Sequence, residues 1–255
     1  MSSTAQAPEA TQFDDAAARQ MQALITDLGR MYQERNEALQ EVVHAHHEAL
    51  FLLAMAAEYK DDDTGTHIVR IGFLAEALAL YLGQSRDYAL MLRKAAPMHD
   101  VGKIGTPDSI LKKPGALTPE ERPVMNRHAQ IGADILGKSR VALFQLGAEV
   151  ALTHHERWDG TGYPRGLAGE DIPLSGRIVS VVDFYDALTM DRVYRKAFSH
   201  EQALQMMLEL RGKAFDPAIV DCFMQRSDEL FALHLSVTEC RMNFTDLVHA
   251  KSPIF

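Results

Sequence analysis

The chain has 255 residues, of which 47% are hydrophobic and 24% charged, and its formal net charge is -9. This composition is typical of a soluble globular protein and excludes a mainly disordered one. The acidic balance argues against binding of DNA or RNA, because neutralising phosphates requires clustered Lys and Arg.

Two further properties indicate the cellular setting. The longest apolar run, residues 49–57, is shorter than the about 20 residues of a transmembrane helix, and residues 1–8 do not resemble a secretory signal. We therefore expect no membrane association. Cys222 and Cys240 are the only cysteines, and neither belongs to a CxxC pair. This argues against a disulfide framework or a thiolate zinc site and favours a reducing cytoplasm.

The N-terminal part predicts a tail followed by a long helix. Residues 1–14 are small and polar, so we expect a disordered tail. Over residues 15–48, apolar side chains recur at steps of three and four, which predicts a helix that could form a coiled coil and a homodimer, or dock a signalling partner. The alternative is that this face packs on the helix's own domain, since Gly29 and Arg35 weaken the seam. The apolar stripe consists of Met21, Leu24, Leu28, Met31, Ala38, Val42, Ala45, Ala49 and Leu52.

Residues 49–225 predict successive amphipathic helices with few alternating β-type runs, so the expected fold class is all-α. The clearest helices are expected over residues 68–82, 86–98, 119–136 and 201–211. Thr118 and Glu121 form a capping box at the start of the third. Glycines and prolines predict a loop over residues 158–173. Residues 177–188 predict a helix, although their β-branched side chains also suit a strand. Residues 226–255 form a C-terminal extension without a readable motif.

The pair His99 and Asp100 is the first candidate for chemistry, because an adjacent imidazole and carboxylate can each hold one of two neighbouring metal ions. Alone, such a pair is more often a solvated surface or a helix end. Further groups of the same type follow at His128, His154, His155 and Asp183. Histidine and carboxylate ligands without thiolate suit iron, manganese or zinc in a hydrolytic or redox site.

Other histidines and carboxylates of the chain are also of the residue types that bind metal ions. Asp63 and His67 are four residues apart, which would place both on one face of a helix. Asp100 is the better bridge between two ions, because a carboxylate has two oxygens. The remaining histidines are predicted to be solvated or interfacial rather than ligands. These are His44, His46, His47, His200, His234 and His249.

Several longer motifs surround these residues in a fixed order. They are MHDVGKIGTPD at 98–108, KPGALT at 113–118, HHERWDGTGYP at 154–164, DFYDALT at 183–189 and DRVYRK at 191–196. Together they closely resemble the HD-GYP family over about residues 50 to 225. The resemblance implies an HD-superfamily helical domain that acts as a metal-dependent phosphodiesterase. The implied reaction converts cyclic di-GMP to linear pGpG, with further hydrolysis to GMP left open.

The resemblance also implies a ligand set for two or three divalent ions, iron in preference to manganese. Members with three ions have a glutamate where this chain has Asp63, which leaves the third ion open. Lys103 would lie near the scissile phosphate and assist metal-aided hydrolysis. The implied metal ligands are His67, His99, Asp100, His128, His154, His155 and Asp183, with Asp63 for the third ion.

Substrate contacts are implied for two segments. Arg192 and Arg195 would hold phosphates, since arginine can clamp a phosphate through two hydrogen bonds. In the Gly162-Tyr163-Pro164 signature, the tyrosine ring would face a guanine base, with a role in loop packing as the competing interpretation. Two alternative functions stay open: a phosphodiesterase for another cyclic dinucleotide, and an adaptor that docks partners through the N-terminal helix.

Overall fold

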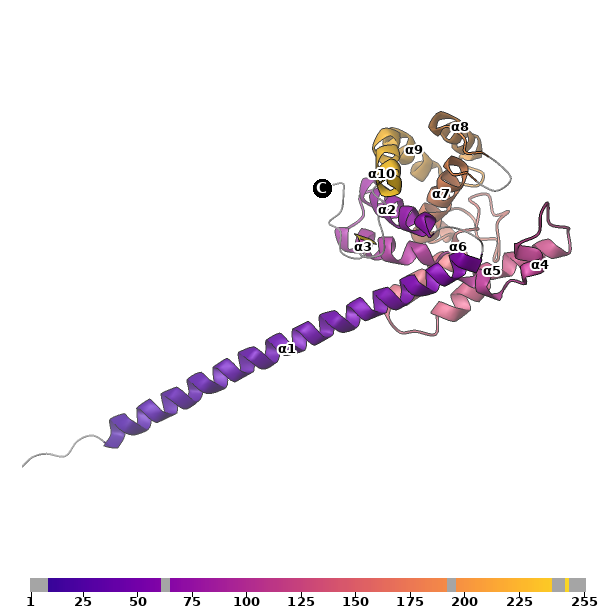
Figure 1. The fold of residues 1–255 in the computed structure, drawn as a ribbon. Helices are drawn as coiled ribbons and strands as arrows, with labels where there is room; N and C mark the ends of the chain where they lie inside the picture. The colour runs from indigo at the N-terminus through magenta and orange to yellow at the C-terminus, as the bar shows by residue number, and fades with distance from the viewer. Residues whose placement is uncertain (1–8, 61–64, 192–195, 240–245, 248–255) are drawn as a thin grey trace, which may run out of the picture. The chain divides into compact units, whose positions relative to one another are not determined.

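The computed structural model of the protein describes residues 9–60, 65–191, 196–239 and 246–247. Within these ranges the chain is helical and contains no β-strand, only an isolated bridge between Arg211 and Phe215. The prediction of an all-α fold with a long N-terminal helix is therefore confirmed (Figure 1). No described helix is long and apolar enough to cross a membrane.

The described helices follow one another with short connections. Short 3-10 helices are η1 (Ala96–Met98), η2 (Val101–Gly105) and η3 (Gly169–Asp171). The α-helices are α1 (Glu9–Lys60), α2 (Thr66–Tyr81), α3 (Arg86–Ala95), α4 (Asp108–Leu111), α5 (Glu121–Leu136), α6 (Ala142–Thr153), α7 (Leu174–Thr189), α8 (His200–Leu210), α9 (Pro217–Gln225) and α10 (Ser227–Glu239).

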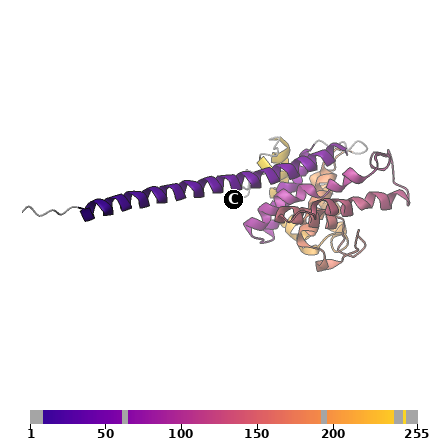
Figure 2. The same cartoon turned by 90° about the horizontal axis from the view of Figure 1, so that it is seen from below.

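The chain divides into two units, residues 1–46 and residues 47–255. In the first unit α1 is a single helix, and Figure 2 shows it without a break. It begins at Glu9 and continues to Lys60, so it extends beyond the predicted range of 15–48 at both ends. Its apolar stripe faces solvent: Met21, Leu24 and Leu28 are each more than half exposed.

The second unit is built around α2. This helix is apolar on almost every side, and all its residues from His67 to Ala79 are buried, as expected for a helix enclosed by others. Helices α3, α7 and α10 pack against it. The last turns of α1 join this core through Leu50, Ala54 and Ala57, whereas Leu52 of the predicted stripe is 60% exposed. The domain therefore uses a different face of α1 from the predicted stripe.

Local sequence signals explain the bounds of several helices. The predicted helix 86–98 is α3 followed by η1, because Pro97 interrupts the α-helical hydrogen bonds. The two hydrogen bonds of the predicted capping box form, since Thr118 N–H donates to Glu121 Oε2 (2.8 Å) and Glu121 N–H donates to Thr118 Oγ1 (3.3 Å). Helix α5 itself begins at Glu121, two residues after the predicted start. The segment that also suited a strand is helix α7.

Candidate metal centre

The pair His99 and Asp100 lies at a break between helices, after the 3-10 turn at Pro97 and directly before η2. Gly102 in η2 packs against the main chain of α5, and a Cβ at this position would overlap the carbonyl oxygen of His128. Only glycine allows this close approach. The contact places the buried pair beside His128.

The first group that could hold a metal ion, here called the first ligand group, consists of Asp100, His128, His154 and His155, each with one donor atom within 4.8 Å of the others. His128 comes from α5, and the two adjacent histidines follow the end of α6. Asp100 Oδ1 lies 3.2 Å from His128 Nε2 and 3.7 Å from His154 Nε2. Four groups from three segments thus converge on one point.

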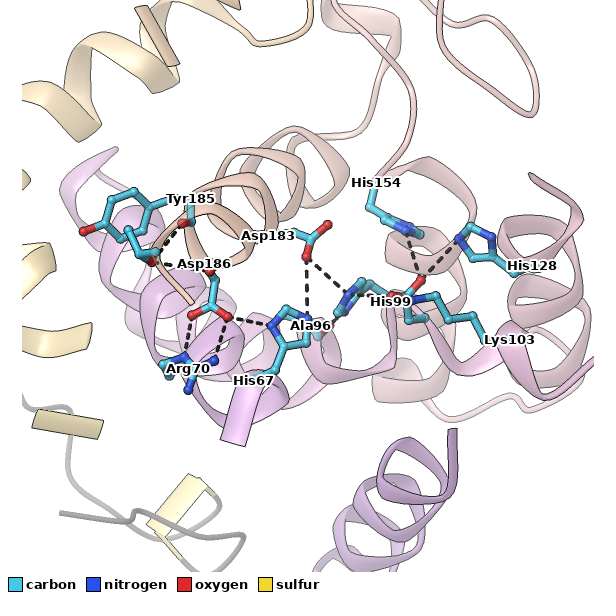
Figure 3. Close-up of polar contacts among 12 residues, drawn as sticks. His67, Arg70, Ala96, His99, Lys103, His128, His154, Asp183, Tyr185 and Asp186 are labelled. Carbon is cyan, nitrogen blue, oxygen red and sulfur yellow. Dashed lines mark hydrogen bonds and ion pairs between the residues drawn. The ribbon is translucent and has the colours of Figure 1, made fainter. Parts of the chain in front are cut away.

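The second ligand group consists of His67 on α2, His99, and Asp183 on α7, again within 4.8 Å of one another. Asp183 Oδ1 lies 3.6 Å from His67 Nε2 and 3.7 Å from His99 Nε2, and Figure 3 shows both contacts as dashed lines from this carboxylate. The two groups adjoin, because His99 Nε2 is 3.3 Å from Asp100 Oδ2. Asp100 therefore presents one oxygen to each group, as a bridging ligand must.

Hydrogen bonds on the outer side of three imidazoles leave their inner nitrogens available. Because a carbonyl oxygen only accepts, each Nδ1 carries a proton, which leaves Nε2 as the nitrogen that could bind a metal ion. The Nε2 atoms of all three rings are buried and have no hydrogen-bond partner among the described residues. Buried polar atoms normally have one, so these nitrogens fit metal ligands. The Nδ1 contacts to main-chain oxygens are His99 to Ala96 (3.1 Å), His128 to Met125 (2.8 Å) and His154 to Ala151 (3.0 Å).

His67 is oriented by a carboxylate that the sequence analysis missed, Asp186. This side chain is buried and accepts a hydrogen bond of 2.7 Å from His67 Nδ1. Arg70 donates to both of its oxygens from Nε and Nη2 (Figure 3). A carboxylate on the outer nitrogen of a ligand histidine fixes the ring and its tautomer. A sequence signal existed, because Asp183 and Asp186 are three residues apart on one face of α7.

The structure corrects the prediction for His234. The sequence suggests a solvated or interfacial histidine, but His234 is only 4% exposed, and its Nε2 lies 3.1 Å from Asp186 Oδ1. The prediction is wrong because the buried face of α10, formed by Leu230, Leu233 and Val237, packs in the core. Nothing in the motifs near the site indicates that this helix reaches it.

Lys103 lies one turn after Asp100, and its Nζ is 2.6 Å from Asp100 Oδ2. Burial alone would raise the pKa of Asp100, but Lys103 and His99 together hold this pKa well below its ordinary value. The carboxylate is therefore ionised, which is the form that binds cations. The side chain of Lys103 is partly exposed and borders the cleft described below.

The histidines differ in protonation. Burial, reinforced by the neighbouring His154, lowers the pKa of His155 well below its ordinary value, and burial also lowers that of His128. Both are neutral, as metal ligands must be. For His67, burial is the largest influence and favours a lower pKa, but the hydrogen bond and charge of Asp186, together with the charges of Glu58 and Asp183, outweigh it and raise the pKa to about 9.

The loop that carries residues 162–164 is held by Glu156, which directly follows the two ligand histidines. Glu156 is 2% exposed, and its two oxygens accept hydrogen bonds from the main-chain N–H groups of Arg165 (2.7 Å) and Leu167 (2.9 Å). A buried carboxylate thus fastens the loop to the metal-ligand segment. This role of Glu156 is not evident from the sequence.

Gly162 and Tyr163 explain why the loop sits so close to the ligands. A Cβ at Gly162 would lie 2.6 Å from Glu156 Cα, so only glycine fits against that main chain. Tyr163 N–H donates to the His155 carbonyl (3.2 Å), and the two rings lie 4.7 Å apart. The Tyr163–Pro164 peptide is cis. The tyrosine ring therefore lies beside a ligand histidine.

A cleft of about 800 Å³ opens over both ligand groups. This size is within the usual range for small-molecule sites, about 300 to 1,000 Å³. Lys103 and Tyr163 line it, as do Lys112 and Arg157, which the sequence analysis did not select. These cations border the cleft together with carboxylates, among them Glu58, Asp183 and Asp191.

Three predicted site residues, Asp63, Arg192 and Arg195, lie outside the described residues. The third metal ion and the phosphate contacts of the two arginines therefore stay predictions.

Comparison with known proteins gives the family. A family model described as an HD domain matches residues 51–219. A cyclic di-GMP phosphodiesterase of Thermotoga maritima is 46% identical over 183 residues, which is 72% of this chain and 50% of that protein. The chain belongs to the HD-GYP family of HD domains.

Two further relatives show how much of this HD-GYP chain resembles known proteins. A 3'3'-cGAMP-specific phosphodiesterase of Vibrio cholerae is 40% identical over 75% of this chain and 37% of that protein. The solved structure of a cyclic GMP-AMP-specific phosphodiesterase from the same organism shares the fold, with a TM-score of 0.59 and 20% identity over 81% of this chain and 54% of that chain. The chain spans half or less of the length of the curated relatives named here.

Proposed function

We propose that the protein is a metal-dependent phosphodiesterase that hydrolyses cyclic di-GMP to linear pGpG in second-messenger signalling. The observation that carries this proposal is the pair of ligand groups that share Asp100 beneath one cleft. Sites for two neighbouring ions are widely used for displacement at phosphorus. The names of relatives, among them cyclic di-GMP phosphodiesterases, support the substrate. A second hydrolysis of the linear product would yield GMP.

We propose iron, or alternatively manganese, as the bound metal, because the donors are imidazole and carboxylate without thiolate. The first ligand group would hold one ion and the second group another, and a third ion would require Asp63. When bound, the ions would polarise a phosphate oxygen and lower the pKa of the attacking water.

The chain's own groups would complete the site. Lys103 would donate a hydrogen bond to a non-bridging phosphate oxygen or a proton to the leaving 3'-oxygen. The ring of Tyr163 would stack on a guanine base, a contact worth about 1 to 3 kcal/mol. Arg192 and Arg195 would hold the phosphates, which arginine can contact through two hydrogen bonds.

A related substrate is the second candidate, because several relatives are named as 3'3'-cGAMP-specific phosphodiesterases. Both dinucleotides offer the same phosphodiester bonds and differ in one base. The bases, not the metal centre, would decide between them.

The experiment that tests the proposal compares the two substrates directly. The full chain, loaded with Fe(II) or Mn(II) without oxygen, should convert cyclic di-GMP to pGpG, with a kcat/KM at least about tenfold above that for 3'3'-cGAMP, a difference of 1.4 kcal/mol. Chromatography identifies the products. A chain with bound metal that cleaves neither dinucleotide would contradict the proposed function, and a preference for 3'3'-cGAMP would replace the substrate.

We propose that a second copy of the chain covers the stripe of α1. One core position of the heptad holds Met21, Leu28, Arg35, Val42 and Ala49, and the position directly before the last four of these holds Asp27, Glu34, Glu41 and Glu48. In a parallel pair of helices this flanking position lies next to the partner's core residue. Arg35, which interrupts the seam, would then meet Glu34 of the second copy and set the register.

Light scattering on the full chain tests this dimer. Leu28→Lys introduces a charge into the seam and should halve the mass, whereas Gln40→Lys on the outer face should leave it unchanged. If both variants keep the mass of the unaltered protein, the helix does not form the dimer. A monomeric unaltered chain would instead favour docking of a different signalling protein.

The remaining assignments follow from this arrangement. We propose that residues 49–225 form the catalytic domain, preceded by an N-terminal segment (1–14), which is already helical from Glu9, and the dimerising helix (15–48), and followed by an extension (226–255). We propose the cytoplasm as its location, where a free thiol such as Cys222 stays reduced.

A further inference from the structure

We propose that His234 of α10 is a positioning residue of the metal centre, which holds His67 in its ligand orientation by acting through Asp186. This inference rests on the ligand set proposed above. The matching family model ends at residue 219, before α10 begins, so the inference concerns a part of the chain beyond that match.

The Asp186 carboxylate is held from two sides. Its Oδ1 accepts hydrogen bonds from Arg70 Nε and His234 Nε2, and its Oδ2 accepts from Arg70 Nη2 and His67 Nδ1. Arg70 is on α2 and His234 is on α10. Two donors on each oxygen fix the plane of the carboxylate, and that plane fixes the direction of the His67 ring.

The protonation of His234 follows from its partners. An ionised carboxylate only accepts, so Nε2 of His234 carries the proton that it donates to Asp186. Thr189 Oγ1 is 3.3 Å from the same nitrogen and donates its own proton to the Tyr185 carbonyl oxygen (2.9 Å). Nδ1 of His234 is buried and has no hydrogen-bond partner among the described residues. An apolar side chain would avoid this penalty, so packing alone does not explain a histidine here.

The core gives His234 a fixed position from which to act. Leu230, Leu233 and Val237 of α10 are buried, and α10 packs on α2, which carries both His67 and Arg70. Without His234, Oδ1 of Asp186 keeps only the bond from Arg70 Nε. The carboxylate can then rotate toward the guanidinium, which loosens its bond to His67 and the second ligand group.

Metal retention in the full chain tests the inference. His234→Leu removes the donor and keeps an apolar side chain of similar bulk, and His234→Gln restores an N–H donor near the position of Nε2. His200→Leu is the matched control, because His200 stacks on Phe231 of α10 and bonds the Tyr185 hydroxyl, with no contact to Asp186. Each Mn(II)-loaded variant is titrated with a chelator, bound manganese is counted, and the melting temperature of the metal-free form is recorded.

We expect His234→Leu to lose one ion at a chelator concentration roughly three- to tenfold lower than the concentration that the unaltered chain requires. This change is smaller than the about 10- to 100-fold loss of metal affinity that follows replacement of a residue bonded directly to a metal ligand. His234→Gln should recover most of this loss, and His200→Leu should match the unaltered chain. Equal retention in His234→Leu would overturn the inference while leaving the proposed function intact. A lower melting temperature in His234→Leu without rescue by His234→Gln would also overturn it, because the role would then be structural. An unaltered chain that binds no manganese would contradict the ligand set and the inference together.

Discussion

The two ligand groups are oriented in different ways. In the first group, the outer nitrogens of His128 and His154 bond to carbonyl oxygens three residues earlier in the chain. In the second group, His67 is held by Asp186, which lies 119 residues further along and is itself held by α2 and α10. His99 of the second group also bonds locally, to the carbonyl oxygen of Ala96. Local main-chain geometry thus orients three of the histidines, whereas tertiary packing orients His67. Side-chain substitutions away from the ligands should therefore damage the centre only through His67.

The largest effect is expected where the groups meet. Asp100→Asn removes the charge that both groups share, so the chain should lose bound metal. Its rate of hydrolysis of cyclic di-GMP should fall more than about 100-fold, which exceeds the usual effect of replacing a residue that only hydrogen-bonds to a metal ligand. Elemental analysis and turnover measure this loss. Asp87→Asn, an exposed aspartate on α3, serves as the control and should behave as the unaltered chain. Full activity in Asp100→Asn would remove the basis for a shared centre.

The sharpest test of the contrast compares Asp186→Asn with Met125→Ala. An asparagine cannot accept from four donors, so metal affinity should fall about 10- to 100-fold. Met125→Ala keeps the main-chain carbonyl that orients His128 and should leave metal affinity within about twofold, a difference below 0.5 kcal/mol. Chelator competition gives both values. Similar losses in the two variants would show that the local and tertiary halves do not differ.

A smaller effect, on substrate rather than metal, is expected at Glu156. Glu156→Gln replaces one carboxylate oxygen by an amide that cannot accept, which should loosen the loop of Tyr163 at a cost of about 1.5 to 3 kcal/mol. KM for cyclic di-GMP should rise at least tenfold while the metal content stays constant. Glu170→Gln, exposed in the same loop, is the control. Loss of metal without a change in KM would contradict the assigned role.

The smallest effect is expected at the end of α1. Lys60 Nζ donates to the carbonyl oxygens of Ile104 (2.7 Å) and Thr106 (2.6 Å), directly after Lys103. Lys60→Met should lower kcat severalfold, as expected for the loss of about 0.5 to 1.5 kcal/mol, and Lys60→Arg should restore most of it. Steady-state kinetics separates kcat from KM. An unchanged kcat in Lys60→Met would show that this anchor has no influence on the site.

The sequence predicts best what is local. The helical class, the capping box of Thr118 and Glu121, and the helix α7 all follow from short-range signals and are confirmed. Asp186, Glu156 and His234 were missed because their roles depend on contacts between segments that only the fold brings together. Of these, Asp186 was within reach, since it shares a helix face with Asp183. The face by which α1 joins the core was also hidden, because the stronger apolar pattern lies on the other side.

The central claim is that two ions joined by Asp100 are required for hydrolysis. The most direct measurement titrates the metal-free full chain with Mn(II) without oxygen and follows bound manganese and pGpG formation in the same samples. The account predicts that activity stays near zero for the first ion and reaches its maximum when two ions per chain are bound. Full activity with one ion, or hydrolysis that does not depend on bound metal, would contradict it.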